Sequence, residues 1–178
     1  MDDITLVKEC SKGNAKAQRL LFDKFSKKML GVCLRYSSNL EEAEDVLQEG
    51  FIKVFTKITD FSCDGSLEGW IRRIMVNTSL DSIRKNTKFL KDISIDKVDF
   101  QMGSNDFIIE QLNANDLLLL INSMPDGYKV IFNMFAIEGY SHNDIAMTLG
   151  ISESTSKSQY LRAKGYLRGK LELMGHER

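Results

Sequence analysis

Proline is almost missing from this chain of 178 residues, in which Pro125 is the only one. The alternation of apolar and polar residues that marks a half-buried strand is confined to a brief patch around residues 93–95. Proline interrupts helices, so its scarcity, together with the lack of alternation, predicts an all-α fold. Hydrophobic residues make up 43% of the chain, which is enough to form packed cores and excludes global disorder.

Cysteine and histidine are also scarce. Cys10, Cys33 and Cys63 are far apart and lack the paired spacing of a zinc site, and the two histidines, His142 and His176, add no ligand pattern. We therefore expect no metal site and no cofactor. An odd number of cysteines without a signal peptide fits a reducing compartment.

No segment approaches the roughly 20 consecutive apolar residues that a membrane span requires. The first ten residues, MDDITLVKEC, are acidic and contain no long apolar run. The sequence therefore predicts no membrane insertion and a cytoplasmic location.

Catalytic motifs are missing too. The chain has no glycine-rich phosphate loop and no pairing of a nucleophile with a base. His142 lies at the start of a predicted helix, where we expect a surface residue rather than a catalytic base. The sequence therefore predicts that the protein is not an enzyme.

The formal net charge of −1 conceals an uneven distribution. Residues 1–85 carry 14 basic and 13 acidic side chains, residues 86–116 carry 3 and 6, and residues 117–178 carry 7 and 6. The acidic middle has low periodicity and a Gly-Ser-Asn turn at residues 103–105, which is typical of a linker.

Helical periodicity accounts for the remainder of the chain. We predict helices over residues 4–12, 14–36, 40–59 and 66–85, then from about residue 111, from Pro125 onward, and finally a pair of helices from Ser141. The inward side of the second helix would carry Ala17, Leu20, Leu21, Phe25 and Met29. The sequence thus predicts two small helical domains, residues 1–86 and 111–178, joined by a flexible acidic linker at 87–110.

The final helix pair is typical of a helix-turn-helix. Ser141 and Asp144 form a capping box, Gly150 ends the first helix in a left-handed conformation, and Ser152 caps the second. Small Ala146 lies where two crossing helices approach closely. On the second helix, an inner side carries Ser156, Tyr160, Ala163 and Leu167, while an outer side carries Ser154, Ser158, Arg162 and Gly165.

The outer side of this last helix suits the major groove of DNA. Residues 157–170 include five basic side chains and no acidic one, and the small hydroxyls of Ser154, Thr155 and Ser158 fit contact with base edges and phosphates. The alternative is an ordinary helical hairpin whose basic side is merely solvated.

Two further groups of residues lie in the first half. On the third predicted helix, Asp45, Gln48 and Glu49 border Ile52 and would suit a basic helical partner, although a solvated helix surface has the same pattern. On the fourth, Arg73, Asn77 and Arg84 share one side bordered by Trp70, while Leu67, Ile71, Ile74 and Thr78 are expected in the core. Aromatic, arginine and amide groups together are what unstacked bases require, but Trp70 and Phe61 also suit a core.

At these residues the chain resembles a known family. The segments EEAEDVLQEGFIKVF and FSCDGSLEGWIRRIMVNTSLDSIRK look like the polymerase-binding and −10-reading part of bacterial sigma factors. The segment MPDGYKVIFNMFAIEGYSHNDIAMTLGISESTSKSQYLRAKGYL looks like their −35-reading domain. The two-domain organisation resembles the extracytoplasmic-function (ECF) group, and the resemblance spans most of residues 5–172.

The resemblance implies a protein that binds core RNA polymerase, recognises promoter DNA and assists melting. It implies polymerase contacts for Asp45, Gln48, Glu49 and Ile52, and −35 contacts for Ser154, Thr155, Lys157, Ser158, Leu161 and Arg162. For the −10 element it implies Phe61, Ser62, Asp64, Trp70, Arg73, Asn77, Arg84 and Lys85. An anti-sigma factor is a further partner that the family often uses, and the acidic linker is similar to the family's tether.

Two residues depart from the family pattern. Ser156 stands where many relatives bury a valine, which predicts looser packing or a locally satisfied hydroxyl. Gln159 replaces a frequent arginine, which would remove a phosphate contact. Besides the sigma factor, two other hypotheses remain at this point: a stand-alone helix-turn-helix regulator, which would bind duplex DNA without polymerase, and an enzyme, which lacks any recognisable catalytic motif.

Overall fold

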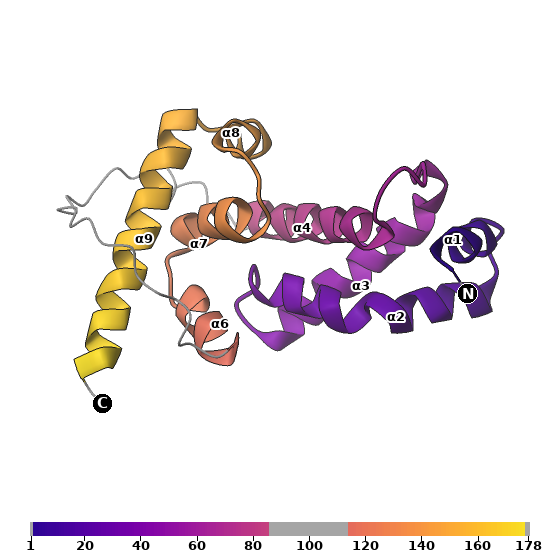
Figure 1. Ribbon diagram of the computed structural model, residues 1–178, viewed down its shortest axis with the longest axis horizontal. Coiled ribbons are helices and arrows are strands. Elements are labelled where there is room, and N and C mark those ends of the chain that lie inside the picture. Colours follow the sequence, from indigo (N-terminus) through magenta and orange to yellow (C-terminus); the bar gives the residue numbers. More distant parts are fainter. Residues whose placement is uncertain (1, 86–113, 177–178) are drawn as a thin grey trace. The chain divides into compact units, whose positions relative to one another are not determined.

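The computed structural model describes residues 2–85 and 114–176, and the regular structure within these ranges is entirely helical (Figure 1). The predicted all-α fold is confirmed. The chain divides into two units, residues 1–85 and 86–178. The predicted linker at 87–110 and the alternating patch near residue 93 lie outside the described residues.

The first unit contains four α-helices and one short 3-10 helix. These are α1 (Asp3–Ser11), α2 (Ala15–Leu34), α3 (Leu40–Thr56), η1 (Ile58–Asp60) and α4 (Leu67–Lys85). Helix α3 ends three residues earlier than predicted, because the chain tightens into η1, which keeps Ile58 buried.

Local side chains fix where these helices begin. The carboxylate of Asp2 accepts a hydrogen bond from the Thr5 backbone N–H. The Asn14 amide oxygen accepts hydrogen bonds from two backbone N–H groups in the first turn of α2. Asn39 accepts a bond from the Glu42 backbone in the same manner at the start of α3. Each cap satisfies backbone N–H groups that have no partner within the helix.

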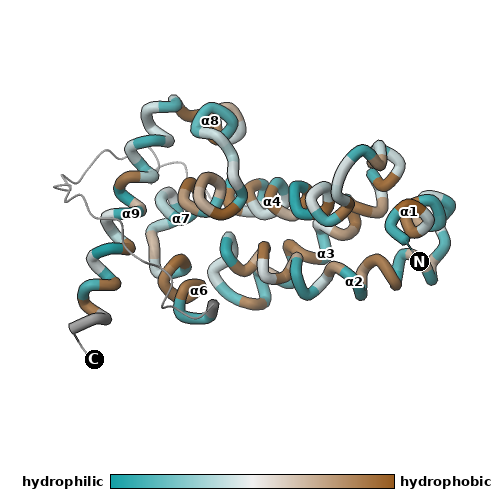
Figure 2. Tube along the Cα trace, viewed as in Figure 1, coloured by the Kyte–Doolittle hydropathy of each residue, from teal (hydrophilic) through white to brown (hydrophobic). Residues whose placement is uncertain are grey.

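The core of the first unit forms where α2, α3 and α4 pack against one another. Its fully buried side chains include Leu21, Met29, Val54, Ile71 and Met75. Figure 2 shows hydrophobic residues recurring along these three helices, as a single buried side on each would require.

Two predicted core residues are not in the core. Leu20 remains 52% exposed, and Ile74 is only half-buried. Each is followed directly by the residue that is buried in its place, Leu21 and Met75, about 100° further round the helix. Apolar character alone did not reveal which of two adjacent residues faces the neighbouring helices.

The second unit contains α6 (Ala114–Asn122), α7 (Asp126–Phe132), a π-helical turn η3 (Asn133–Ile137), α8 (His142–Leu149) and α9 (Glu153–His176). Pro125 immediately precedes α7, where its missing N–H costs no helical hydrogen bond. The π-helical turn that continues α7 was not predicted, because the sequence carries no signal for one.

The predicted helix-turn-helix caps are confirmed. Ser141 and Asp144 form a complete capping box at the start of α8, and Gly150 ends that helix with φ of 68°. The Ser152 hydroxyl accepts a bond from the Thr155 backbone at 3.0 Å, which starts α9. These caps define the tight turn between α8 and α9.

The core of the second unit combines α6 and α7 with the inner side of α9. Leu120, Ile121, Met124 and Phe132 pack in one cluster with Ala163 and Leu167 of α9. The Tyr166 hydroxyl donates a 2.7 Å hydrogen bond to the Ser123 carbonyl at the end of α6. Residues far apart in sequence thereby hold the long helix in place.

His142 is not the surface residue that the sequence analysis expected. Its ring is half-buried and stacks on the ring of Phe135, with 4.1 Å between the two centroids. The distance from its Nδ1 atom to the Ser156 hydroxyl oxygen is 2.9 Å. Burial, assisted by the positive charge of Lys157, lowers the pKa of His142 below its ordinary 6.5. The neutral ring is therefore the form that suits the folded state.

A glycine pair tests the packing of the first unit. A methyl group at Gly50 would overlap Sδ of Met75, whereas one at Gly31 would meet no atom within 4 Å. We expect Gly50→Ala to destabilise the unit by about 1–2 kcal/mol, because overpacking outweighs the gain in helix propensity. Gly31→Ala should stabilise it by about 0.5–1 kcal/mol. Urea unfolding followed through Trp70, the single tryptophan, measures both, and equal stabilisation by the two would contradict the packing described.

Lowering the pH should destabilise the second unit. Below about pH 6.5 the unfolded chain protonates His142 while the folded chain still resists protonation, so the unfolded state binds more protons and stability falls. The variant His142→Gln removes this titration, and its stability should fall less than that of the wild type between pH 7.5 and pH 5. Urea unfolding by circular dichroism at each pH provides the comparison, and parallel pH profiles would rule out this contribution.

Candidate functional site

The outward side of α3 presents a polar patch that ends at an exposed apolar residue. Asp45 and Gln48 are exposed, Glu49 is half-exposed, and Ile52 lies one turn further along with 66% of its surface accessible. Glu49 forms a 3.0 Å ion pair with Lys53, which also reaches Asp81 of α4 at 3.5 Å. The structure thus brings the four predicted residues together as an acidic surface with an apolar residue at one end.

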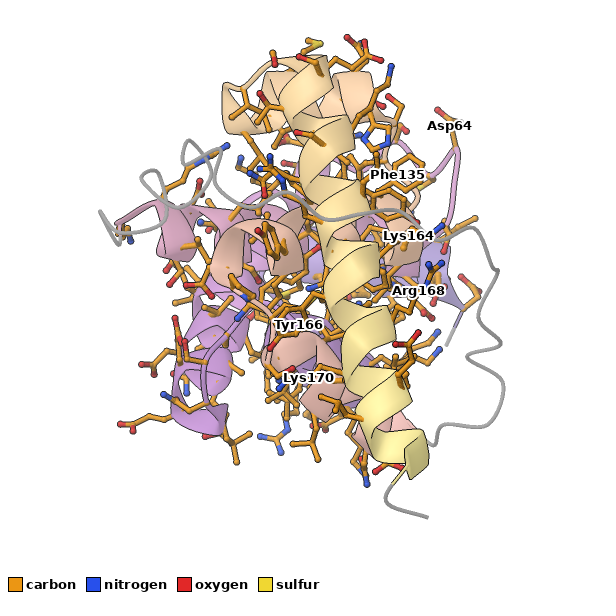
Figure 3. The ribbon with its side chains drawn as sticks, turned by 90° about the vertical axis from the view of Figure 1, so that its left-hand side faces the viewer. Asp64, Phe135, Lys164, Tyr166, Arg168 and Lys170 are labelled. Carbon is orange, nitrogen blue, oxygen red and sulfur yellow. The ribbon has the colours of Figure 1, made fainter. Side chains whose placement is uncertain are left out.

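The loop of residues 61–66 connects η1 to α4 and carries an aromatic pair at its base. The rings of Phe61 and Trp70 are tilted by 47° with centroids 5.5 Å apart, and both side chains are half-buried. Ser62 and Asp64 are exposed, and Figure 3 shows Asp64 at the outer end of the loop. The two aromatic residues therefore support the loop and still expose part of their surface.

Sequence reasoning missed the backbone conformation of Cys63. Its φ of 63° lies in the left-handed region, which glycine normally occupies, and its thiol is exposed. The following Asp64-Gly65 pair indicated a turn but not which residue would take the left-handed position. This conformation turns the chain sharply within the loop.

Helix α4 places its predicted polar residues on one exposed side. Arg73 and Asn77 are exposed. Arg73 follows Trp70 by three residues and Asn77 follows Arg73 by four, so they share a side. Arg84 and Lys85 are exposed in the last turn, where Arg84 forms a 3.3 Å ion pair with Asp81. The predicted side is confirmed as solvent-facing, with two basic groups at the end of the helix.

On α9 the predicted contact residues differ in exposure. Ser154, Lys157 and Leu161 are exposed, whereas Thr155, Ser158 and Arg162 are half-buried. The hydroxyls of Thr155 and Ser158 already form hydrogen bonds within the chain. The Thr155 hydroxyl bonds to the Ser152 hydroxyl at 2.7 Å, and the Ser158 hydroxyl donates to the Thr155 carbonyl at 3.0 Å. Lys157 forms a 2.5 Å ion pair with Glu153.

Gln159 lies on the inner side of α9. The family often carries an arginine at this position, and the loss of a phosphate contact stays a prediction, but the glutamine side chain is completely buried. Ser156, which was predicted on the inner side, is also completely buried, and its hydroxyl meets His142 of α8 rather than a local backbone group. The inner side of α9 is therefore wider than the predicted one, because Gln159 also belongs to it.

The structure also reveals basic residues that the sequence analysis left out of the site. Lys164 and Arg168 continue the side of α9 that begins with Lys157, and Figure 3 shows them on one side of the helix, with Tyr166 and Lys170 on the other. The spacings of seven and four residues place these three cations in one row. Figure 2 shows hydrophilic and hydrophobic residues alternating along α9, as its two sides require.

The described residues meet the requirements of neither a metal site nor a membrane span. Within residues 2–85 and 114–176, no three histidine, cysteine, aspartate or glutamate side chains are grouped so as to hold a metal ion. In the same part of the chain, no helix is both long and apolar enough to cross a membrane.

Known proteins resemble both units. Residues 21–89 match the family Sigma-70 region 2, and residues 114–167 match Sigma-70, region 4. The RNA polymerase sigma-H factor of Pseudomonas aeruginosa is 25% identical over 91% of this chain and 90% of its own length. The ECF RNA polymerase sigma factor SigW of Bacillus subtilis is 27% identical over 93% of this chain and 94% of its own.

A solved structure shares the fold. The sigma factor RpoE of Bartonella quintana, in complex with the anti-sigma factor NepR, superposes with a TM-score of 0.55 and 21% identity over 86% of this chain and 96% of that chain. Two family matches in chain order, together with relatives of nearly the same length, identify this all-helical chain: it belongs to the sigma-70 family, as an ECF RNA polymerase sigma factor that acts in transcription initiation.

Proposed function

We propose that this sigma factor binds core RNA polymerase through α3, reads the −10 element with the residue 61–66 loop and α4, and reads the −35 element with α9. One observation carries the proposal: the region 2 match covers the exposed surfaces of α3 and of the loop with α4, and the region 4 match covers that of α9. The roles of individual residues rest on geometry and on the family pattern.

The polymerase contact is assigned to Asp45, Gln48, Glu49 and Ile52. Exposed carboxylates attract a basic helical surface and orient it, while Ile52 loses its water shell when the partner covers it. By the family pattern, the partner is the pair of clamp helices in the largest polymerase subunit. Acidic groups around one apolar residue are a suitable surface for that contact.

The −10 contact is assigned to the loop residues Phe61, Ser62 and Asp64 and to Trp70, Arg73 and Asn77 of α4. Partly exposed aromatic rings stack on unpaired bases, and the amide of Asn77 can bond to base edges. Capturing a base flipped out of the duplex offsets an unstacking cost of a few kcal/mol, so melting needs no ATP. Arg84 and Lys85 lie further along α4 and are assigned to contacts with the phosphate backbone of the adjacent DNA.

The −35 contact is assigned to Ser154, Thr155, Lys157, Ser158, Leu161 and Arg162. They lie along the first half of α9, which a helix-turn-helix inserts into the major groove. Lys157 and Arg162 bring positive charge, and Leu161, 45% exposed, offers an apolar contact to thymine methyl groups.

DNA binding should depend on polymerase. Several of the assigned cations are already paired with carboxylates, Lys157 with Glu153 and Arg84 with Asp81, and the formal net charge is −1. Affinity for duplex DNA rises with the number of phosphates neutralised, so either unit alone binds weakly. Docking on polymerase presents both units to one promoter and raises their effective concentration.

This role places the protein in the cytoplasm with polymerase and DNA. An anti-sigma factor is a further proposed partner, since RpoE of Bartonella quintana was solved with one. The exposed apolar residues Ile52 and Leu161 lie on the surfaces that such an inhibitor would have to cover. Purification of the chain from its own cells as a lone, fully active monomer would contradict this partnership.

Transcription in vitro with core polymerase and a pool of genomic fragments tests the proposal. We expect start sites, absent without the protein, that share two spaced upstream elements. Asp45→Ala should reduce this transcription tenfold or more, as a truncated interface hot spot does at about 1.4 kcal/mol per factor of ten. Glu44→Ala, at an exposed neighbour about 100° away on α3, is the matched control. Tight duplex binding without polymerase and no new start sites would favour a stand-alone regulator.

Arg162→Gln tests −35 reading. Loss of a base or phosphate contact should weaken transcription from promoters with an intact upstream element by about 5- to 100-fold, equivalent to about 1–3 kcal/mol. Promoters whose upstream element is already altered should lose less. The control is Lys170→Gln, which removes the same charge about two turns further along α9, outside the residues assigned to the −35 contact. Equal losses for the two variants on every promoter would place Arg162 outside the −35 contact.

A further inference from the structure

Three elements of the second unit meet in a cluster of rings. His142 at the start of α8 stacks on Phe135 of η3 at an interplanar angle of 12°, and Tyr160 of α9 lies 4.6 Å from Phe135 and 5.8 Å from His142 between centroids. Figure 3 labels Phe135 beside the first half of α9. The cluster therefore holds the histidine ring in a fixed plane against the helix that is proposed to read DNA.

One polar contact crosses from this ring to α9. The Ser156 hydroxyl lies 2.9 Å from His142 Nδ1, and Ser156 itself is completely buried. A serine side chain has one rotatable bond before its oxygen, and a hydrogen bond weakens steeply when it is bent. Apolar contacts tolerate sliding, whereas this contact restrains the rotation of α9 about its own axis.

Ser156 occupies the position in α9 where such a restraint matters most. Its direct neighbours are Thr155 and Lys157, and Ser158 follows, all of which are assigned to the −35 contact. Side-chain ends lie about 5 Å from a helix axis, so a rotation of 10° moves them by about 1 Å. Recognition of base edges requires groups placed within about 0.5 Å.

We propose that His142 and Ser156 form a positioning pair that fixes the rotation of α9 and thereby sets how sharply the −35 element is discriminated. This inference rests on the proposed role of α9 in reading that element. Neither residue touches DNA: His142 acts through Ser156, and Ser156 acts through the residues beside it. The desolvation of a buried hydroxyl is tolerated here because the hydrogen bond contributes orientation.

A simple stabilising role makes a different prediction. Removing the hydroxyl leaves His142 Nδ1 without its partner, so the folded state should lose stability whichever role the pair has. If the pair served stability alone, its removal would alter unfolding and leave discrimination unchanged. The positioning role predicts that discrimination falls as well.

The test compares two side chains of equal shape. Ser156→Thr keeps the hydroxyl and Ser156→Val removes it, while both add the same volume. With full-length protein and core polymerase, transcription is measured on a promoter from the pool and on the same promoter with its −35 element altered. We expect Ser156→Val to reduce the ratio of the two activities by about three- to tenfold relative to Ser156→Thr, out of the 5- to 100-fold that a base contact supplies. Thermal unfolding should show a lower melting temperature for Ser156→Val than for Ser156→Thr under either role, so the activity ratio is the measurement that separates the two roles.

His142→Phe approaches the same contact from the other side, since it keeps an aromatic ring on Phe135 and loses the bond to Ser156. It should reduce discrimination as Ser156→Val does, and the double variant should be no worse than either single one, because both remove one shared interaction. Equal ratios for Ser156→Thr and Ser156→Val, or full discrimination in His142→Phe, would overturn the inference. If the wild type itself initiates no transcription, the proposed function fails first, so the two failures are distinguishable.

Discussion

Burial of one side of each helix is the constraint on which the rest of this structure depends. Isolated helices as short as α8 or α6 are marginal in water, so they persist only because their apolar sides pack on neighbours. In the first unit, α2, α3 and α4 bury Leu21, Val54 and Ile71 against one another, and in the second Ala163 and Leu167 hold α9 on α6 and α7. The outward sides are left polar, and these are the surfaces proposed to bind polymerase and DNA.

Cations on the outward sides of the helices are already paired with carboxylates of the same chain. Lys157 and Arg84 are paired with nearby carboxylates, and Asp45, Gln48 and Glu49 lie next to an exposed isoleucine on α3. Surface ion pairs contribute little to stability and are easily exchanged, so phosphates can replace these carboxylates once DNA is near. These pairs support the proposal that the free protein binds DNA weakly and that polymerase brings the promoter within its reach.

Directional contacts supplement the apolar ones where orientation matters. The aromatic pair of Phe61 and Trp70 supports the loop before α4, while the contact of His142 with Ser156 links α8 to α9. Apolar packing brings elements together but permits small rotations, whereas rings and hydrogen bonds restrict them. In both units these directional contacts lie next to residues that are proposed to meet bases.

The sequence by itself determined the helical class, the helix-turn-helix with its capping box and Gly150, and which side of α4 carries Arg73 and Asn77. These features follow from local rules, namely side-chain caps, a left-handed glycine and a period of 3.6 residues. Only the tertiary structure decided that Leu20 stays exposed, that Gln159 is buried, and that His142 belongs to the α8–α9 junction, where it meets the buried Ser156 hydroxyl. The physical reason is that burial depends on which neighbouring helix covers a position, and the sequence does not show which distant side chain meets a buried polar group, as His142 meets Ser156.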